Sequence, residues 1–157
     1  MNSRLPAFAL LFALALPAAA ATVACPDLAA AVQVAACPSD EELRYTFTGY
    51  CSDNNRGYRG DTDVCNDFQA YRKLKNVALW ESADGNFNAY VSCDRAPAEV
   101  RATKPAAIRV GRQGSINLLV CGYGDGLSFT WRTRAACRVD SAADCRDKPA
   151  ACKADCE

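Results

Sequence analysis

Apolar and polar positions alternate most regularly over residues 115–134, on both sides of Asp125-Gly126. An Asp-Gly pair between two apolar runs predicts a β-hairpin, because a type I′ turn needs positive φ at both central residues. With this turn, Val120 lies opposite Trp131. The register then predicts a core face of Ile116, Leu118, Val120, Phe129 and Trp131, and an opposite face of Asn117, Cys121, Thr130, Arg132 and Arg134.

A second hairpin of the same kind is predicted over residues 76–93, with Asp84-Gly85 as its turn. Its register places Trp80 opposite Ala89 and Ala78 opposite Val91. Trp80, Val91 and Cys93 then share one face, so we expect Trp80 to be a core residue and not a platform for a ligand.

The remaining pattern predicts shorter elements. Pro26 at a first helical position indicates a short helix over residues 28–36. Alternation over residues 43–50 predicts a half-buried strand, and Phe68, Tyr71 and Leu74 predict an amphipathic helix over 63–75. Short strands are expected over 99–103 and 107–111, separated by Lys104-Pro105.

These elements predict a single small disulfide-rich domain, mainly β or α+β. Its antiparallel sheet is built on the two Asp-Gly hairpins, with one or two short helices. Residues 1–21 have the features of a secretory signal peptide, since Arg4 precedes an apolar run and a stretch of small residues. We expect the β-rich domain at 22–136 and a cysteine-stapled tail at 137–157, which has almost no apolar side chain larger than Ala.

The cysteine content is the strongest indication of how the chain is stabilised. Ten cysteines after a signal peptide indicate a disulfide framework of up to five bridges: Cys25, Cys37, Cys51, Cys65, Cys93, Cys121, Cys137, Cys145, Cys152 and Cys156. We expect a bridge between Cys93 and Cys121, and another that closes the loop 51–65. Cys25 and Cys37 bond either to each other or to the body of the domain. Lipidation of Cys25, after the lipobox-like Thr22-Val23-Ala24, is a competing possibility that would leave an odd number of thiols.

Charge is balanced overall but unevenly distributed. Loss of Arg4 with the signal peptide leaves 17 basic and 18 acidic residues, so neither nucleic acid nor a membrane surface is indicated as a partner. Residues 22–70 carry eight acids and three bases, whereas residues 93–138 carry three acids and eight bases. The two halves either complement each other in one fold or steer a charged partner.

Catalytic chemistry is restricted by the absence of His. Ser-His, Cys-His and His-ligated metal mechanisms are excluded, and no Cys-x2-Cys pair, phosphate loop or dinucleotide motif is present. No cofactor or metal is therefore expected. A carboxylate-pair hydrolase of sugar polymers remains possible, with Glu81 paired to Asp94 or Glu99.

The polar loop 51–65 is the main candidate binding site, with Arg56, Tyr58, Arg59 and Asp61 as its residues. It could be the inserting loop of an inhibitor. Oxygen ligands on Asp53, Asn55, Asp61 and Asp63 could instead hold calcium, although the spacing matches no EF-hand. Arg59-Gly60-Asp61 also resembles the adhesive tripeptide of integrin ligands, and an ordinary solvated turn is the simplest interpretation.

A second candidate is a face of arginines on the predicted strands: Arg101, Arg109, Arg132 and Arg134. Guanidinium groups that point the same way can take a phosphate or carboxylate. The sequence thus favours a periplasmic or secreted binding or inhibitor module that occludes a protein or anionic partner. A hydrolase and a structural envelope protein are the alternatives.

Overall fold

A computed structural model describes residues 21–139 and 144–157. The predicted signal peptide lies outside this part except for Ala21. The strands are β1 (Ala21–Ala24), β2 (Val32–Gln33), β3 (Val77–Glu81), β4 (Phe87–Ser92), β5 (Ala107–Gln113), β6 (Ile116–Gly124), β7 (Leu127–Thr133), β8 (Cys137–Arg138) and β9 (Lys153–Cys156). The helices are α1 (Asp40–Cys51), α2 (Asn54–Tyr58), α3 (Thr62–Asn66), α4 (Phe68–Lys75) and α5 (Pro97–Ala102), with short 3-10 helices at Leu28–Ala30 and Pro149–Ala151.

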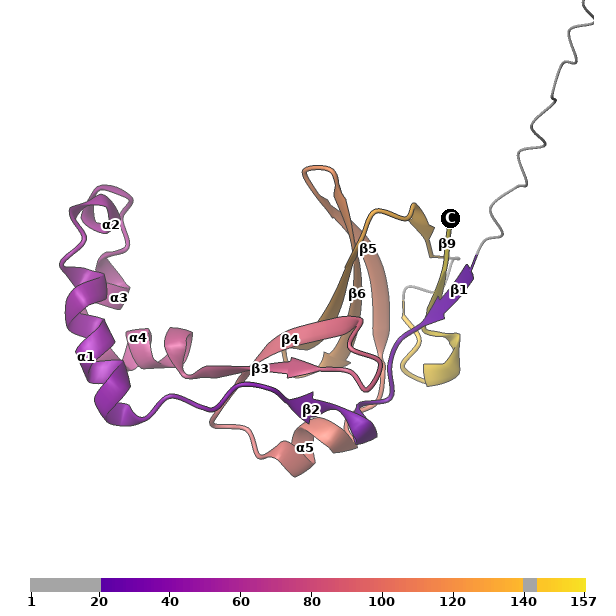
Figure 1. Cartoon of the computed structure of the whole chain (residues 1–157), viewed down its shortest axis with the longest axis horizontal. Coiled ribbons are helices and arrows are strands. Elements are labelled where there is room, and N and C mark those ends of the chain that lie inside the picture. The colour runs from indigo at the N-terminus through magenta and orange to yellow at the C-terminus, as the bar shows by residue number, and fades with distance from the viewer. Residues whose placement is uncertain (1–20, 140–143) are drawn as a thin grey trace, which may run out of the picture.

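Two antiparallel sheets form the fold. One has six strands in the order β2-β3-β4-β7-β6-β5, and the other has three in the order β1-β9-β8. Figure 1 shows α1–α3 at one end of the molecule and β1 with β9 at the other, with the larger sheet between them. The predicted class, mainly β with disulfides and short helices, is confirmed.

The hairpin of β3 and β4 has the predicted register. Trp80 pairs with Ala89 and Ala78 with Val91, and all four side chains are buried. Sequence pattern suffices here because alternation and the position of Asp84-Gly85 specify the same pairing.

The hairpin of β6 and β7 forms, but its predicted register is wrong along most of its length. Gly124 pairs with Leu127 at the turn as expected, whereas Cys121 pairs with Phe129, because an irregularity lies between Gly122 and Gly124. This β-bulge inserts one residue into β6 and reverses the face of every residue before it. Leu119 and Cys121 therefore face the core, and Leu118 does not.

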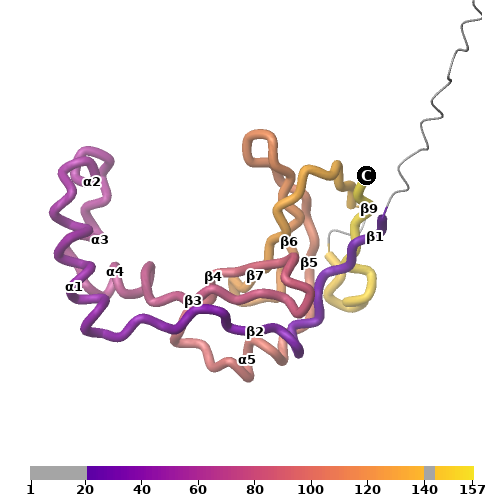
Figure 2. Tube along the Cα trace, viewed as in Figure 1, coloured from indigo at the N-terminus to yellow at the C-terminus, as the bar shows by residue number. Residues whose placement is uncertain are grey.

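The core lies on one face of the six-stranded sheet. Phe129, Leu119 and Cys121 from the sheet pack in one cluster with Leu28 and Val100, all fully buried. The 3-10 helix that contains Leu28 contacts α5, which contains Val100. In the trace of Figure 2, α5 lies beside β2, so these two short helical segments cover one part of the sheet.

Residues 43–50 form part of helix α1, so the predicted strand is wrong. Ser39 caps this helix: its hydroxyl accepts from the Glu42 N–H, and the Glu42 carboxylate accepts from the Ser39 N–H at 2.7 Å. Leu43 is buried, and Phe47 on the next turn packs against the ring of Phe68 at 5.6 Å between centroids. The apolar residues therefore lie at helical spacing.

Three other predictions are corrected. The helix expected over 28–36 is a single 3-10 turn at Leu28–Ala30, and α5 replaces the strand expected over 99–103. The helix expected over 63–75 is divided into α3 and α4, because Asp67 has extended backbone and caps α4 by accepting from the Gln69 N–H. Short polar side chains at such positions favour helix termini.

Four disulfides are present: Cys25–Cys121, Cys37–Cys93, Cys137–Cys156 and Cys145–Cys152. The predicted Cys93–Cys121 bridge is wrong, because both cysteines bond instead to the segment before α1. Cys51 and Cys65 are thiols, so the fifth bridge is absent. Cys25 is buried in its disulfide, which leaves no thiol there for lipidation.

The C-terminal residues 144–157 are held by strand pairing and core packing as well as by disulfide bridges. Strand β9 pairs along its whole length with β1, from Ala21 opposite Cys156 to Ala24 opposite Lys153. Ala154 and Cys156 are buried in the common core cluster. Of the helices in the described ranges, none is long and apolar enough to cross a membrane.

Candidate functional site

Helices α1–α4 form a projecting arm whose far end, residues 51–65, we call the tip (Figure 1). An aromatic cluster joins α1 to α4. The ring of Tyr71 lies 5.2 Å from those of both Phe47 and Tyr50, and its hydroxyl donates to Thr46 at 2.9 Å. Edge-on aromatic contacts of this kind stabilise helix pairs beyond their buried area. The cluster therefore holds α1 against α4 below the tip.

Arg56 faces inward at the tip. Its guanidinium group lies over the ring of Tyr50, at the end of α1, and is 3.8 Å from Asp61 and 4.0 Å from Asp53. The Asp53 carboxylate also accepts from the Asn55 N–H at the start of α2. These contacts give Arg56 a structural role, so only part of its side chain is available to a partner.

Tyr58 and Arg59 face outward. Tyr58 is the last residue of α2, and 90% of it is exposed, while Arg59 follows as an exposed cap. The structure thus separates the four predicted binding residues into two pairs. Arg56 and Asp61 bind each other, and Tyr58 and Arg59 are left for solvent or a ligand.

The calcium and adhesive-tripeptide hypotheses both depend on free carboxylates in this loop. Asp53 and Asp61 instead face Arg56. No group of three His, Cys, Asp or Glu side chains suited to a metal ion occurs in the described part of the chain. Asp61 also begins α3, so the Arg59-Gly60-Asp61 segment is bent between two helices and its carboxylate is engaged.

Cys51 and Cys65 lie at the base of the tip. The Cys51 thiol donates to the carbonyl of Val64 at 3.6 Å, next to Cys65 in the chain. Partial burial and the neighbouring thiol raise the pKa of Cys51 to about 11. Both thiols border a hollow of about 430 Å³, which Tyr58 and Asp61 also line.

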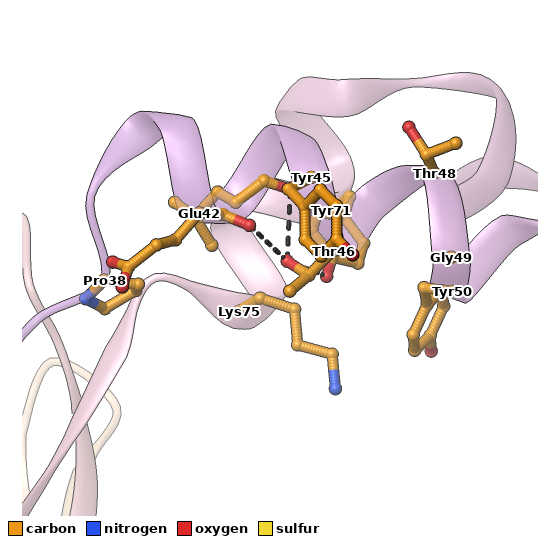
Figure 3. Close-up of a pocket in the computed structure, with 10 residues that line it drawn as sticks. Pro38, Glu42, Tyr45, Thr46, Thr48, Gly49, Tyr50, Tyr71 and Lys75 are labelled. Atoms are coloured by element: carbon orange, nitrogen blue, oxygen red, sulfur yellow. Dashed lines mark hydrogen bonds between the residues drawn. The ribbon is translucent and has the colours of Figure 1, made fainter.

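A groove of about 960 Å³ runs along α1, and the sequence pattern does not indicate it, because residues 43–50 alternate as in a strand. It is lined by Pro38, Glu42, Leu43, Tyr45, Thr46, Thr48, Gly49, Tyr50, Tyr71 and Lys75. Figure 3 shows Thr46 between Glu42 and Tyr71, with Lys75 beside them and Tyr50 further along the helix. The capping-box pattern Ser39-x-x-Glu42 is the signal in the sequence that indicates the start of this helix, and therefore the helix that carries the groove.

Gly49 leaves part of this groove open, and replacing it tests how the helix is built. A Cβ on Gly49 would meet no atom within 4 Å. Gly49→Ala should therefore raise the free energy of unfolding by about 0.5–1 kcal/mol, because glycine is costly inside a helix. Denaturant unfolding followed by circular dichroism measures this.

Gly60→Ala is the matched control in the same arm. Gly60 also has no atom near its would-be Cβ, but its φ is +79°. This variant should lose about 1–2 kcal/mol through backbone strain. Equal effects at the two positions would contradict the helical assignment of residues 40–51.

The three carboxylates proposed for hydrolysis are not brought together as a pair, and two of them are engaged elsewhere. Glu81 is on β3 opposite Asn88, whereas Asp94 follows Ser92 at the other end of the hairpin, and the paired strand from Asn88 to Ser92 alone spans roughly 13 Å. Arg72 binds Asp94 through both guanidinium nitrogens at 3.0 Å and lowers the pKa of that carboxyl. Glu99 caps α5. A general acid needs a raised pKa, so this arrangement does not favour the predicted pair.

Two of the four predicted face arginines share a surface. Arg109 and Arg132 lie on the sheet face opposite the core, where they pair with Val120 and Leu118 of β6. The Arg132 guanidinium donates to Asn88 at 3.0 Å, and neither arginine forms an ion pair with a described residue. Arg134 is exposed beyond the end of β7, while Arg101 belongs to α5, where it stacks on Trp80 and donates to the Ala31 carbonyl.

Comparison of the chain with protein-family models, with curated proteins and with solved structures finds no match.

Proposed function

We propose that this chain is an exported binding or inhibitor module that acts by occlusion, with the tip as its contact surface. Four disulfides fit a protein that folds outside the cytoplasm. Its compartment would be the periplasm or the extracellular medium. Its partner would be a protein that receives Tyr58 and Arg59.

The observation that carries this proposal is the exposure of Tyr58 at the end of a projecting arm. Tyr58 is 90% exposed, so its ring buries little surface within its own fold. Tyrosine and arginine are among the residue types enriched at binding hot spots, and here they are adjacent. In the isolated chain the ring packs against little else, so its function would be to bury its surface against a partner.

Ordering of the tip before binding supports the same proposal. The ion pairs of Arg56 with Asp53 and Asp61 hold α2 against the end of α1, and Arg56 also stacks on Tyr50. A loop that is already ordered loses less conformational entropy when a partner binds. Arg56 and Asp61 would then support the contact surface from behind, while Tyr58 and Arg59 make the contact.

A second surface, on the sheet, supports the alternative that the chain binds an anionic ligand. Arg109 lies opposite Val120 and Arg132 lies opposite Leu118 on the sheet face away from the core, and both can bind a phosphate or carboxylate bidentately. This surface is far from the tip along the chain and is tested separately by charge-removing variants. The tip remains the first choice because its exposed side chains include an aromatic ring.

Tyr58→Ala should weaken binding by about 30-fold or more, as expected for a hot-spot residue, and Arg59→Ala by about tenfold. The oxidised protein without residues 1–21 serves as bait against envelope and secreted extracts. The captured partner is then purified, and its Kd is measured for each variant.

Tyr90→Ala is the control variant. Tyr90 is 74% exposed on β4, so it has similar chemistry and exposure away from the tip. Its replacement should leave the Kd unchanged. A saturable partner that loses affinity with Tyr90→Ala but not with Tyr58→Ala would move the binding surface to the sheet and reject the tip.

A further inference from the structure

Cys51 and Cys65 are the two cysteines that form no disulfide in the described part of the chain, and they lie at the same end of the arm. Cys51 is the last residue of α1, and Cys65 lies within α3. The Cys51 thiol lies 3.6 Å from the carbonyl of Val64, the residue before Cys65, and both cysteines line the same hollow. The other eight cysteines are bonded in pairs.

Both cysteines lie where a small reagent can reach them. Each cysteine is only partly buried, and both border the same hollow of about 430 Å³. Gly57, which also lines this hollow, has no side chain to fill it. A low-molecular disulfide therefore reaches the pair without unfolding of the domain.

The tip has few other interactions to hold it. Neither α2 nor α3 contains a buried residue, so the hydrophobic core contributes little to their order. The ion pairs of Arg56 are partly exposed and have distances of 3.8 and 4.0 Å, a class of contact that stabilises weakly. A covalent link across the base would therefore dominate the stability of the tip.

We propose that Cys51 and Cys65 are a redox-active pair, whose oxidation by a low-molecular or protein disulfide closes the base of the tip. One cysteine loses its proton and attacks the reagent disulfide, which breaks and releases one thiol. The second cysteine then loses its proton and attacks the mixed disulfide, which forms the Cys51–Cys65 bond and releases a second thiol. The protein pair loses two electrons, and the reagent disulfide gains them.

The two states differ in how firmly the segment between the cysteines is held. In the thiol state, the contacts of Arg56 keep residues 52–64 folded, and the segment opens more often than it does when its ends are bonded. In the disulfide state, the ends of the segment are tied together, and the open forms are restricted. The effect on partner affinity rests on the proposed function, whereas the redox chemistry of the pair does not.

Titration in glutathione buffers tests the pair directly. The folded protein is equilibrated at increasing ratios of reduced to oxidised glutathione and treated with iodoacetamide. Its intact mass is then measured by mass spectrometry. We expect two alkyl groups to appear together in one step, both mapped to Cys51 and Cys65, while the other eight cysteines stay unmodified. Alkylation of both cysteines even in the most oxidising buffer would overturn the proposal. So would a pair that resists reduction until the other bridges open.

Tryptic cleavage after Arg56 and Arg59 measures the opening of the tip. Cleavage should be at least about tenfold slower for the oxidised than for the reduced protein, because only open forms are cut. The variant with Cys51→Ser and Cys65→Ser should be cut at the same fast rate in both buffers. A rate that does not depend on the buffer in the parent protein would overturn the proposed closure.

Single variants separate the chemistry from the binding. Cys51→Ser or Cys65→Ser alone should take up one glutathione and form no internal bridge. A titration step together with the same partner Kd in both redox states would support the redox pair. It would contradict the effect of the pair on binding at the tip. If the titration step is absent, the redox proposal fails whatever the partner does.

Discussion

Leu119→Ala should lower the free energy of unfolding by about 3 kcal/mol or more, whereas Leu118→Ala should lower it by about 1 kcal/mol or less. The two leucines are adjacent on β6, but Leu119 is fully buried in the core cluster and Leu118 lies on the opposite face. Truncation of Leu119 leaves a cavity that the packed sheet cannot close. Denaturant unfolding of the oxidised protein, followed by tryptophan fluorescence, measures both values.

This comparison also tests the bulge between Gly122 and Gly124. Without the bulge, the register derived from Asp125-Gly126 alone would place Leu118 in the core and Leu119 outside it. A larger loss for Leu118→Ala than for Leu119→Ala would therefore restore that register and contradict the pairing of Cys121 with Phe129.

Removal of the Cys25–Cys121 disulfide should have the second large effect. Replacement of both cysteines by Ala should cost about 4–5 kcal/mol, because the bridge links residues 96 positions apart and strongly restricts the unfolded chain. The N-terminal segment that contains Leu28 is also held to the sheet through this bond. Unfolding in denaturant under non-reducing conditions gives the value.

The Cys145–Cys152 pair is a matched control, since its cysteines are also buried but only seven positions apart. Its replacement by two Ala residues should cost about 2–3 kcal/mol. A smaller loss for Cys25 and Cys121 than for this short loop would contradict the long-range pairing. Non-reducing peptide mapping identifies the bonded partners independently.

Local chemistry in the sequence was sufficient for several elements. The β3–β4 hairpin has the register that Asp84-Gly85 and the buried Trp80 specify, since turn and alternation agree over a few residues. Phe68 and Tyr71 were correctly placed on a helix. Each of these predictions depends on residues close together in the chain, where spacing alone determines which side chains share a face.

The error at residues 43–50 has a simple physical cause. Leu43, Tyr45 and Phe47 alternate as in a strand, but Leu43, Phe47 and Tyr50 also have helical spacing. The packing of Phe47 and Tyr50 against Tyr71 of α4 decides between these two periods, and the Ser39 cap starts the helix. Tertiary contacts override a short local pattern when both periods fit the same residues.

At the candidate site, the sequence by itself determined that residues 52–64 are polar and rich in turn-forming residues, which predicts an exposed loop with Tyr58 and Arg59. Only the tertiary structure decided that Arg56 faces inward to Asp53, Asp61 and Tyr50, and that the tip stands at the end of a helical arm. Likewise, the sequence determined a disulfide-rich chain, while the fold chose which cysteines meet. Composition and spacing act locally, whereas a bridge, a bulge or an ion pair depends on which distant segments the packed core brings together.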